Sequence, residues 1–390
     1  MKSNGDNSVL ICAGIFWPEI GGPASYAKTL ASKLASSWPV TVLTYSSVRR
    51  SNDADLPFAV VRVWSGWPKG LRHLIYFLQA FRLTRRHQIV FSMNAVSAGL
   101  PARFASRMFK RKFAVKIVGD AAWERAINNG TTSLLINDFQ KSKRPGGLIG
   151  LLHWTQFQVC KGAHHIIVPS KYLSGIVAGW GIPAEKITVI YNGTDFVPST
   201  LSKEEARKKL GISGNIILSI GRLVPWKGFR MLIKIMPKLG EINQFFSLII
   251  VGSGPDRRNL ELMIRNLGLD RKVRLAGKAS HSELADYLAA ADLFVLNTGY
   301  EGFSHQILEV MAAGVPLITT NAGGNVEIIR QGENGLMVKY NDEFNLIEAI
   351  RVLWNNPDIQ ERLVEEAEKT VKEFAPERMF NETISLLEHV

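Results

Sequence analysis

Two carboxylates flank the start of a predicted helix in the segment EGFSHQILEVMAAG, residues 301–314. Glu301 precedes the helix, and Glu309 lies inside its second turn. Ser304 is placed to cap the helix, so the N–H groups after it would point at an anion. Glu309 could accept hydrogen bonds from a pair of ribose hydroxyls, with Glu301 facing the other end of the ligand. Taken alone, the stretch favours a structural interpretation over a nucleotide site, with Glu301 capping the helix or forming a salt bridge and Glu309 facing solvent.

Two cations follow a predicted strand in the segment SIGRLVPWKGF, residues 219–229. Arg222 and Lys227 are five residues apart, just beyond the carboxyl end of the strand. Two positive charges at such a place suit a diphosphate, which carries two or more negative charges. The alternative is a pair of ordinary surface cations.

The string GSGPDR, residues 252–257, predicts a turn that ends a strand. It lacks the third glycine of a dinucleotide motif, and Pro255 removes an N–H where a phosphate would need one. No P-loop motif occurs in the sequence. Hydride transfer is therefore disfavoured.

The elements that must position these residues alternate between short β-rich apolar runs and helical patterns. This alternation predicts an α/β fold with parallel sheets wound by crossover helices. The predicted strands cover residues 9–16, 40–45, 59–64, 89–93, 114–119, 165–170, 187–192, 216–223, 246–254, 273–277, 293–297, 316–321 and 335–340. Ligands of such sheets bind outside the carboxyl ends of the strands.

The strand–helix pattern resets near residues 191–211, where an Asn-Gly turn and a Pro/Ser/Thr segment precede a new series. We therefore expect one domain over residues 1–195 and a second over residues 196–375. After a proline break, a final helix at about 376–390 is expected to pack back on the first domain. Two doubly wound sheets facing each other would form a cleft with a nucleotide-bearing donor on one side and an acceptor on the other.

A series of motifs in this order resembles the family 4 retaining glycosyltransferases, which have the GT-B fold. The motifs are ITVIYNGTD (187–195), GRLVPWKG (221–228), LIIVGSGP (248–255), VRLAGKASHSELADYLAAADLFVLNT (273–298), EGFSHQILEVMAAGVPLITT (301–320), GGNVEII (323–329) and GENGLMV (332–338). Their joint occurrence is far more specific than a lone glycine motif. The resemblance implies two Rossmann-like doubly wound domains facing each other across a cleft, the first binding the acceptor and the second the nucleotide-sugar donor.

The resemblance also implies roles for the charged residues. Arg222 and Lys227 are expected to hold the donor diphosphate and to stabilise the leaving nucleoside diphosphate. Glu309 matches the acid that binds the ribose, and Glu301 matches the acid that contacts the transferred sugar.

The same helix start is expected to assist the donor phosphate. The backbone amides of Phe303, Ser304 and His305 match this role. Many family members carry a glycine and an aliphatic residue where this chain has Ser304 and His305. A backbone role survives that change, but the sugar pocket can be reshaped. Glu327 matches a family position too, where we expect a supporting structural role.

In the N-terminal half, EIGGPASYA (19–27) resembles the family's glycine-rich first loop. Gly21 and Gly22 would let the backbone approach donor phosphate and acceptor closely; the alternative is a plain loop before a proline-started helix. The histidine that many members carry after the fifth strand is missing. Asp120 is the best local candidate for a polar contact to sugar or acceptor, although ordinary lining of a cleft is the alternative. Residues 122–150 are expected to form a long surface excursion.

The charge of the chain is concentrated in its first half. The net charge is +13, and residues 1–200 carry 24 basic and 9 acidic residues against 23 and 25 in the remainder. The densest cluster is RFASRMFKRKFAVK, residues 103–116. It indicates a solvated basic face or an anionic partner, such as a membrane surface or a phosphorylated acceptor. Nucleic acid is disfavoured because no recognisable nucleic-acid module accompanies the charge.

The chain is expected to be cytoplasmic, and a peripheral site at the inner face of the cytoplasmic membrane fits the basic half. No apolar run is long enough to span a bilayer, and the N-terminus lacks the features of a secretory signal. Cys12 and Cys160, the two cysteines, lie in apolar surroundings and read as reduced core thiols.

The family resemblance implies a retaining, metal-independent hexosyltransferase. It would move a sugar from a nucleoside-diphosphate sugar to a glycan, lipid-linked or other anionic acceptor in cell-envelope polysaccharide or glycolipid synthesis. The eight histidines show no metal-ligand spacing, so no metal or other cofactor is expected. The alternatives are a GT-B nucleotide-sugar epimerase, a non-catalytic nucleotide-binding protein, and a glycoside hydrolase. A hydrolase would use two carboxylates but has no need of the Arg/Lys pair.

Overall fold

The computed structural model describes residues 7–19, 21–48, 51–143 and 146–390. The chain divides into two compact units. The first unit comprises residues 1–125, 142–190 and 379–390, and the second comprises residues 126–141 and 191–378. The main division falls at 190/191, beside the predicted boundary at 195/196. Residues 126–141, which the sequence assigns to the first domain, group with the second unit.

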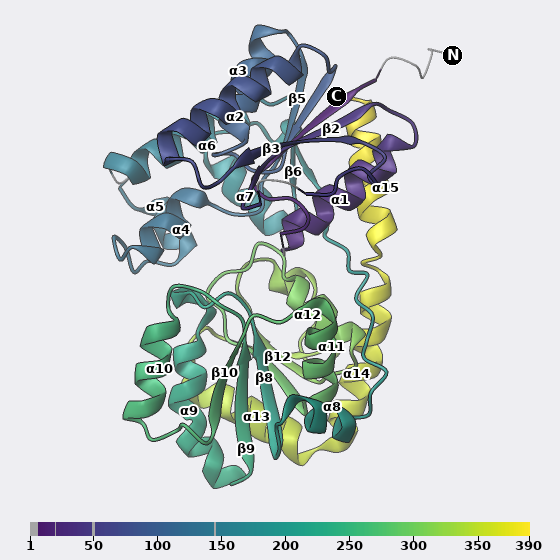
Figure 1. Ribbon diagram of the computed structural model, residues 1–390. Helices are drawn as coiled ribbons and strands as arrows, with labels where there is room; N and C mark the ends of the chain where they lie inside the picture. Colours follow the sequence, from purple (N-terminus) through teal and green to yellow (C-terminus); the bar gives the residue numbers. More distant parts are fainter. Residues whose placement is uncertain (1–6, 20, 49–50, 144–145) are drawn as a thin grey trace. The chain divides into compact units, whose positions relative to one another are not determined.

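The first unit is built on a seven-stranded sheet in which all paired strands are parallel, in the order β3-β2-β1-β4-β5-β6-β7 (Figure 1). Its strands are β1 (Val9–Ala13), β2 (Val40–Ser46), β3 (Ala59–Trp64), β4 (Ile89–Ser92), β5 (Lys112–Lys116), β6 (His165–Val168) and β7 (Ile187–Val189). Its helices include α1 (Gly22–Ala35), α2 (Lys69–Thr84), α3 (Gly99–Met108), α4 (Ala121–Asn128), α6 (Gly147–Lys161), α7 (Lys171–Gly179) and the short η1 (Ala184–Lys186).

Both faces of this sheet are buried, because alternate side chains of its strands enter two different cores. Leu10 and Cys12 of β1 belong to a core shared with α2, α3, α6 and α7. Val9 and Ile11 enter the opposite core together with α1 and the last helix, α15 (Pro376–Glu388). Phe380 of α15 stacks on Tyr26 of α1, with ring centroids 5.4 Å apart. The last helix is therefore part of the first unit's core.

The second unit is built on a six-stranded parallel sheet in the order β10-β9-β8-β11-β12-β13. Its strands are β8 (Asn215–Ile220), β9 (Phe246–Val251), β10 (Val273–Gly277), β11 (Leu293–Leu296), β12 (Leu317–Thr320) and β13 (Leu336–Val338). Its helical elements are α5 (Ile136–Lys141), α8 (Lys203–Leu210), η2 (Pro225–Lys227), α9 (Phe229–Ile242), α10 (Arg257–Asn266), α11 (His281–Ala290), α12 (His305–Ala312), η3 (Gly323–Glu327), α13 (Glu343–Asn355) and α14 (Pro357–Lys372). The central strand β8 again feeds two cores, Ile217 into one and Leu218 into the other.

Each predicted strand is present, with ends that differ by a few residues. Residues 252–256 form the expected turn, and α10 begins at Arg257. The expectation of an irregular excursion over residues 122–150 was wrong in large part. That segment contains α4, α5 and the start of α6. Short helices of this kind show too few turns to give a clear apolar periodicity.

Cys12 and Cys160 are buried free thiols of the first unit's core. Among the residues that the structure describes, no helix combines the length and apolarity that crossing a membrane requires.

Candidate functional site

The predicted donor site lies in the segments that follow the central strands of the second sheet. Arg222 and Lys227 come after β8, whereas Glu301 and the start of α12 come after β11. β8 and β11 are hydrogen-bonded neighbours in the sheet. Because the carboxyl ends of parallel strands meet at one edge, the sheet brings these segments together.

An ion pair joins the two segments. The Lys227 Nζ donates to Glu301 Oε1 across 2.6 Å, and each side chain is only 10% exposed. The structural alternative for Glu301, a salt bridge, is therefore present in the fold. An ammonium has three donors, and Glu301 takes one of them. The described structure shows no hydrogen-bond partner for the other two.

Two glycines let the loops approach at backbone distance. Gly228 has a φ of 62°, and a Cβ there would lie 1.8 Å from the carbonyl oxygen of Asn297. Gly323 has a φ of 60°, and its Cβ would lie 2.0 Å from the carbonyl oxygen of Glu301. That same oxygen accepts a hydrogen bond from the N–H of Gly324 at 2.9 Å. The Glu301 backbone is thereby fixed from the β12 side.

Ser304 caps α12, as the sequence predicts. Its Oγ accepts a hydrogen bond from the N–H of Ile307 at 3.4 Å. The neighbouring Phe303 is buried between the rings of Tyr191 and Phe374, with centroids 5.3 and 5.5 Å away. The Phe303 side chain is thus an anchor, so only its backbone is suited to contact a ligand. His305 begins the helix and is partly exposed.

Glu309 lies within α12 and is partly buried. Burial, and secondarily the negative charge of Asp195, raise its pKa from 4.5 to about 7. No described residue forms a hydrogen bond with its carboxylate. A partly buried carboxylate with a raised pKa and no internal partner is typical of a functional site. No sequence pattern indicates that Asp195, far away along the chain, lies close enough to Glu309 to raise its pKa.

Arg222 is exposed directly after β8. Glu327, in η3, hydrogen-bonds Tyr191, and burial together with this carboxylate raises the pKa of Tyr191 to about 12. This contact fits the supporting role that we expected for Glu327. The second unit therefore collects Arg222, Lys227 and Glu301 in loops after adjacent strands.

The glycine-rich loop lies in the first unit, where Gly21 precedes α1 and Gly22 is its first residue. Ile20 of this loop is outside the described residues. A Cβ on Gly22 would meet no atom within 4 Å. The backbone here borders open space, as close approach of a ligand would require.

Asp120 is completely buried and caps α4. Its Oδ1 accepts hydrogen bonds from the N–H groups of Ala122 and Trp123 at 2.9 and 3.0 Å, and from the Gln156 amide at 3.0 Å. This geometry gives Asp120 a structural function. Its contact with sugar or acceptor stays a prediction.

Lys116 is a candidate that our sequence reasoning missed. It ends β5, is buried, and holds its Nζ 3.7 Å from the centroid of the Tyr26 ring. Burial lowers its pKa from 10.5 to about 7. The available signal was a lysine inside the otherwise apolar run AVKIVG, residues 114–119. A buried lysine of this kind at the carboxyl end of a strand is a candidate for ligand or proton chemistry.

Within the described part of the chain, no three His, Cys, Asp or Glu side chains gather in an arrangement that could hold a metal ion.

Comparison with known proteins bears on both units. Residues 202–370 match the family described as Glycosyl transferases group 1, and residues 21–193 match the Glycosyl transferase 4-like domain. An uncharacterised glycosyltransferase of Methanocaldococcus jannaschii is 30% identical over 62% of this chain and 65% of its own length. The lipopolysaccharide core biosynthesis glycosyltransferase LpsE of Rhizobium meliloti is 31% identical over 54% of this chain and 59% of its own length. The chain thus spans less than two thirds of these relatives.

Solved structures match over nearly the whole chain. HepE from Anabaena, in complex with UDP and glucose, gives a TM-score of 0.80 at 18% identity, covering 98% of this chain and 100% of that one. The sucrose-phosphate synthase of Thermosynechococcus elongatus gives 0.79 at 21% identity, covering 98% of both chains. Two parallel sheets with flanking helices and these neighbours establish the GT-B fold. With family matches in both units, the chain belongs to the group 1 glycosyl transferases of family 4 type.

Proposed function

We propose that this chain transfers a hexose-type sugar from a nucleoside-diphosphate sugar to an acceptor, with retention of configuration. The observation that carries the proposal is the buried Lys227–Glu301 pair beside α12, which itself carries the partly buried carboxylate of Glu309. One end of a single sheet thus offers positive charge for a diphosphate and an acid for ribose hydroxyls. A glycoside hydrolase would need neither.

In this proposal, Lys227 and Arg222 bind the diphosphate and stabilise the negative charge that develops as it leaves. Fixed donors aimed at a developing charge supply a large share of catalysis in many enzymes. We propose that these cations and the α12 amides suffice, without a metal or other cofactor. Glu301 contacts the transferred sugar and is not assigned as a nucleophile, because it is already committed to Lys227. The leaving phosphate helps deprotonate the acceptor on the same face of the sugar.

For the acceptor, we propose a lipid-linked or other anionic glycan reached at an anionic membrane surface. Leu71, Leu74 and Leu78 form an exposed stripe on α2, with exposures of 41%, 54% and 57%. Helix α3 lies beside α2 (Figure 1). Its Phe104 and Met108 are also exposed. Apolar side chains flanked by cations suit an interfacial helix face. The role of the LpsE relative in lipopolysaccharide core biosynthesis supports a cell-envelope acceptor.

The part of the proposal that concerns the nucleotide donor is tested by calorimetry with UDP, GDP and ADP in the presence of EDTA. We expect one nucleotide to bind, and UDP is the first choice because the HepE structures contain UDP and UDP-glucose. Glu309→Ala should abolish most of that binding. A folded chain that binds none of the three would refute the proposal. Binding without transfer to any acceptor, but with interconversion of the sugar, would instead identify an epimerase.

The membrane half is tested by flotation with vesicles that contain phosphatidylglycerol, against vesicles of phosphatidylcholine alone. We expect binding to the anionic vesicles at physiological salt. The double variant Leu74→Ser/Leu78→Ser should bind less. Equal flotation of the native chain with both kinds of vesicle, or with neither, would contradict this part of the proposal.

A further inference from the structure

A second group of charges, which the donor site does not use, lies in the first unit. It is located at the amino end of β5, opposite the carboxyl ends of the strands where a ligand of this sheet is expected. A cavity of about 310 Å³ opens where α3 and α6 end and β5 begins. This volume is at the lower limit of small-molecule pockets, about 300–1,000 Å³. Ligands of doubly wound sheets bind beyond the carboxyl ends of the strands. This cavity is therefore separate from the site expected in the same unit.

The cavity is lined by cations, and its described lining includes no acid. Its basic side chains are Arg103, Arg107, Lys110, Arg111 and Lys112. None of the five has a carboxylate within ion-pair distance among the described residues. Helix C-termini attract cations, and Arg107 in the last turn of α3 fits that explanation. Arg111 donates to Gln88 Oε1 at 2.8 Å and to the carbonyl of Arg85 at 3.0 Å, and the other four cations still exceed what the ends of two helices account for.

Arg103 lines this cavity, and its Nε packs against the backbone of Gly162. Its Nε is buried and has no hydrogen-bond partner in the described structure. Gly162 makes room for it, since a Cβ there would lie 2.2 Å from that nitrogen. Burial, and then the charge of Arg107, lower the pKa of Arg103. The buried Nε cannot reach a ligand, so the terminal guanidinium nitrogens, which have no hydrogen bond in the described structure, are the groups that can donate to an anion.

Two further residues at the cavity, Lys110 and His164, favour the binding of an anion. Lys110 has a φ of 51°, at a position after a helix where glycine is the usual choice. His164 accepts a hydrogen bond from the Phe113 N–H at its Nδ1, so its Nε2 carries the proton and is a donor. Burial lowers the pKa of His164, with Lys112 contributing. The cavity thus presents donors of several kinds to one volume.

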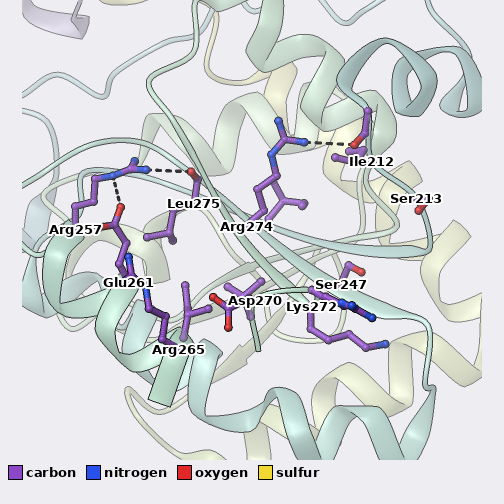
Figure 2. Close-up of a pocket in the computed structure, with 15 residues that line it drawn as sticks. Ile212, Ser213, Ser247, Arg257, Glu261, Arg265, Asp270, Lys272, Arg274 and Leu275 are labelled. Atoms are coloured by element: carbon purple, nitrogen blue, oxygen red, sulfur yellow. Dashed lines mark hydrogen bonds and ion pairs between the residues drawn. The ribbon is translucent and has the colours of Figure 1, made fainter. Parts of the chain in front are cut away.

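A second basic cavity, in the second unit, provides the contrast (Figure 2). This cavity, of about 510 Å³ beside β10 and α10, also has five cations but includes Glu261 and Asp270. Arg257 is paired with Glu261 at 2.8 Å, and Arg274 donates to the carbonyl of Leu210 at 3.1 Å. Lys272 also donates to the carbonyl of Gln244, so three of its five cations are engaged within the protein, against Arg111 alone among the described hydrogen bonds and ion pairs of the first cavity.

We propose that the cavity bounded by Arg103, Arg107 and Lys110 binds a phosphate group. The geometry suits a compact anion with several acceptor oxygens, since arginine and lysine donors converge there without a competing carboxylate. The phosphate can belong to a lipid headgroup or to a soluble phosphorylated ligand. Both sources present the same chemistry to these side chains.

The test is calorimetry with inorganic phosphate at constant ionic strength. We expect the Kd to rise at least tenfold in Arg103→Gln/Arg107→Gln. The matched control is Arg265→Gln/Arg271→Gln, which removes the same charge from the cavity of Figure 2. It should change the Kd less than twofold. Equal losses in both variants would show a general charge effect and overturn the proposal, as would the absence of phosphate binding to the native chain.

Two variants separate binding from folding. Lys110→Gly relieves a left-handed lysine, so it should raise the melting temperature while weakening phosphate binding severalfold. Gly162→Ala keeps every charge but displaces Arg103, and should also weaken binding. Unchanged phosphate affinity in a folded Gly162→Ala chain would contradict the assigned cavity.

Competition distinguishes the two sources of phosphate. If inorganic phosphate releases the native chain from phosphatidylglycerol vesicles and Arg103→Gln/Arg107→Gln no longer floats, the cavity takes a headgroup. If vesicle binding is unchanged in that variant while phosphate affinity is lost, it takes a soluble ligand. UDP binding should be unaffected either way, so failure of the phosphate cavity and failure of the donor site are read separately.

Discussion

The segments that follow the strands are built differently in the two sheets. In the second unit, the loops after β8, β11 and β12 are joined by the Lys227–Glu301 pair and by glycines at backbone contact. In the first unit, Gly22 borders open space and Asp120 is consumed in capping α4. The comparison teaches that one sheet presents a charge arrangement fixed before a ligand binds. The other presents exposed backbone and open space at Gly22.

Breaking the ion pair should produce the largest effect. Lys227→Ala leaves Glu301 buried without a counter-charge, so the free energy of unfolding should fall by about 3–5 kcal/mol. Sugar transfer should fall at least about 100-fold, because a donor to the leaving group is lost. Urea denaturation and initial rates measure the two effects.

The control for that change is Lys227→Met/Glu301→Gln, which removes both charges. It should regain most of the stability yet none of the activity. Recovery of activity in this double variant would mean that the pair is structural only.

Adding one side-chain carbon atom between the segments that follow β8 and β11 should have the next largest effect. Gly228→Ala places a Cβ against the carbonyl of Asn297 and also strains a φ of 62°. We expect a loss of about 2–4 kcal/mol, from the clash and the backbone strain together. Gly332→Ala is the matched control, since its φ is 74° but its Cβ would meet no atom within 4 Å. It should lose only about 1–2 kcal/mol. Equal losses would show that the loops are not in tight contact.

Variants of Asp120 test whether this residue of the first unit only caps α4 or also contacts the sugar or the acceptor. Asp120→Ala removes an acceptor from three buried donors and should cost about 2 kcal/mol of stability. Asp120→Asn keeps an oxygen acceptor and should cost less than half of that. If Asp120 acts only as a cap, Asp120→Asn transfers sugar at nearly the native rate. A rate that falls tenfold or more in this stable variant would establish contact with the sugar or the acceptor.

The smallest effect concerns pH and Glu309. Its pKa rises from 4.5 to about 7 on folding, so the folded chain binds an extra proton between these values. The resulting stabilisation is complete below pH 4.5 and is lost as the pH rises through about 7. Ribose hydroxyls need the ionised carboxylate as acceptor, so UDP affinity should fall about tenfold for each unit below the pKa.

The phosphates of UDP also titrate in this pH range, and their effect on affinity is the same for the native chain and for Glu309→Gln. The difference between the two chains therefore measures the contribution of the Glu309 carboxylate. The native chain should lose affinity between pH 8 and pH 6 more steeply than Glu309→Gln. Parallel curves would exclude Glu309 as the ribose-binding group.

Local sequence patterns predicted much of the fold and part of the candidate site. The strands were readable because each is a short apolar run between turn residues, and Ser304 was readable as a cap from its place before an apolar helical pattern. The sequence placed Arg222, Lys227 and Glu301 after predicted strands and Glu309 in the helix that follows, whereas the pairing of β8 with β11 comes from the structure. The features that the sequence could not predict depend on contacts between residues that are far apart along the chain. The effect of Asp195 on Glu309, the Gln156 bond to Asp120, and the cavity around Arg103 all join residues far apart along the chain.

The place of α15 in the first unit's core has a consequence for how the chain folds during synthesis. Met379, Phe380 and Leu387 complete an apolar cluster that otherwise comes from the first 200 residues. The ribosome must therefore make the whole second unit before the first can close. At about 5–20 residues per second, this interval lasts about 10–40 s. Through that time, one face of the nascent sheet lacks its last helix and is open to chaperones or to aggregation.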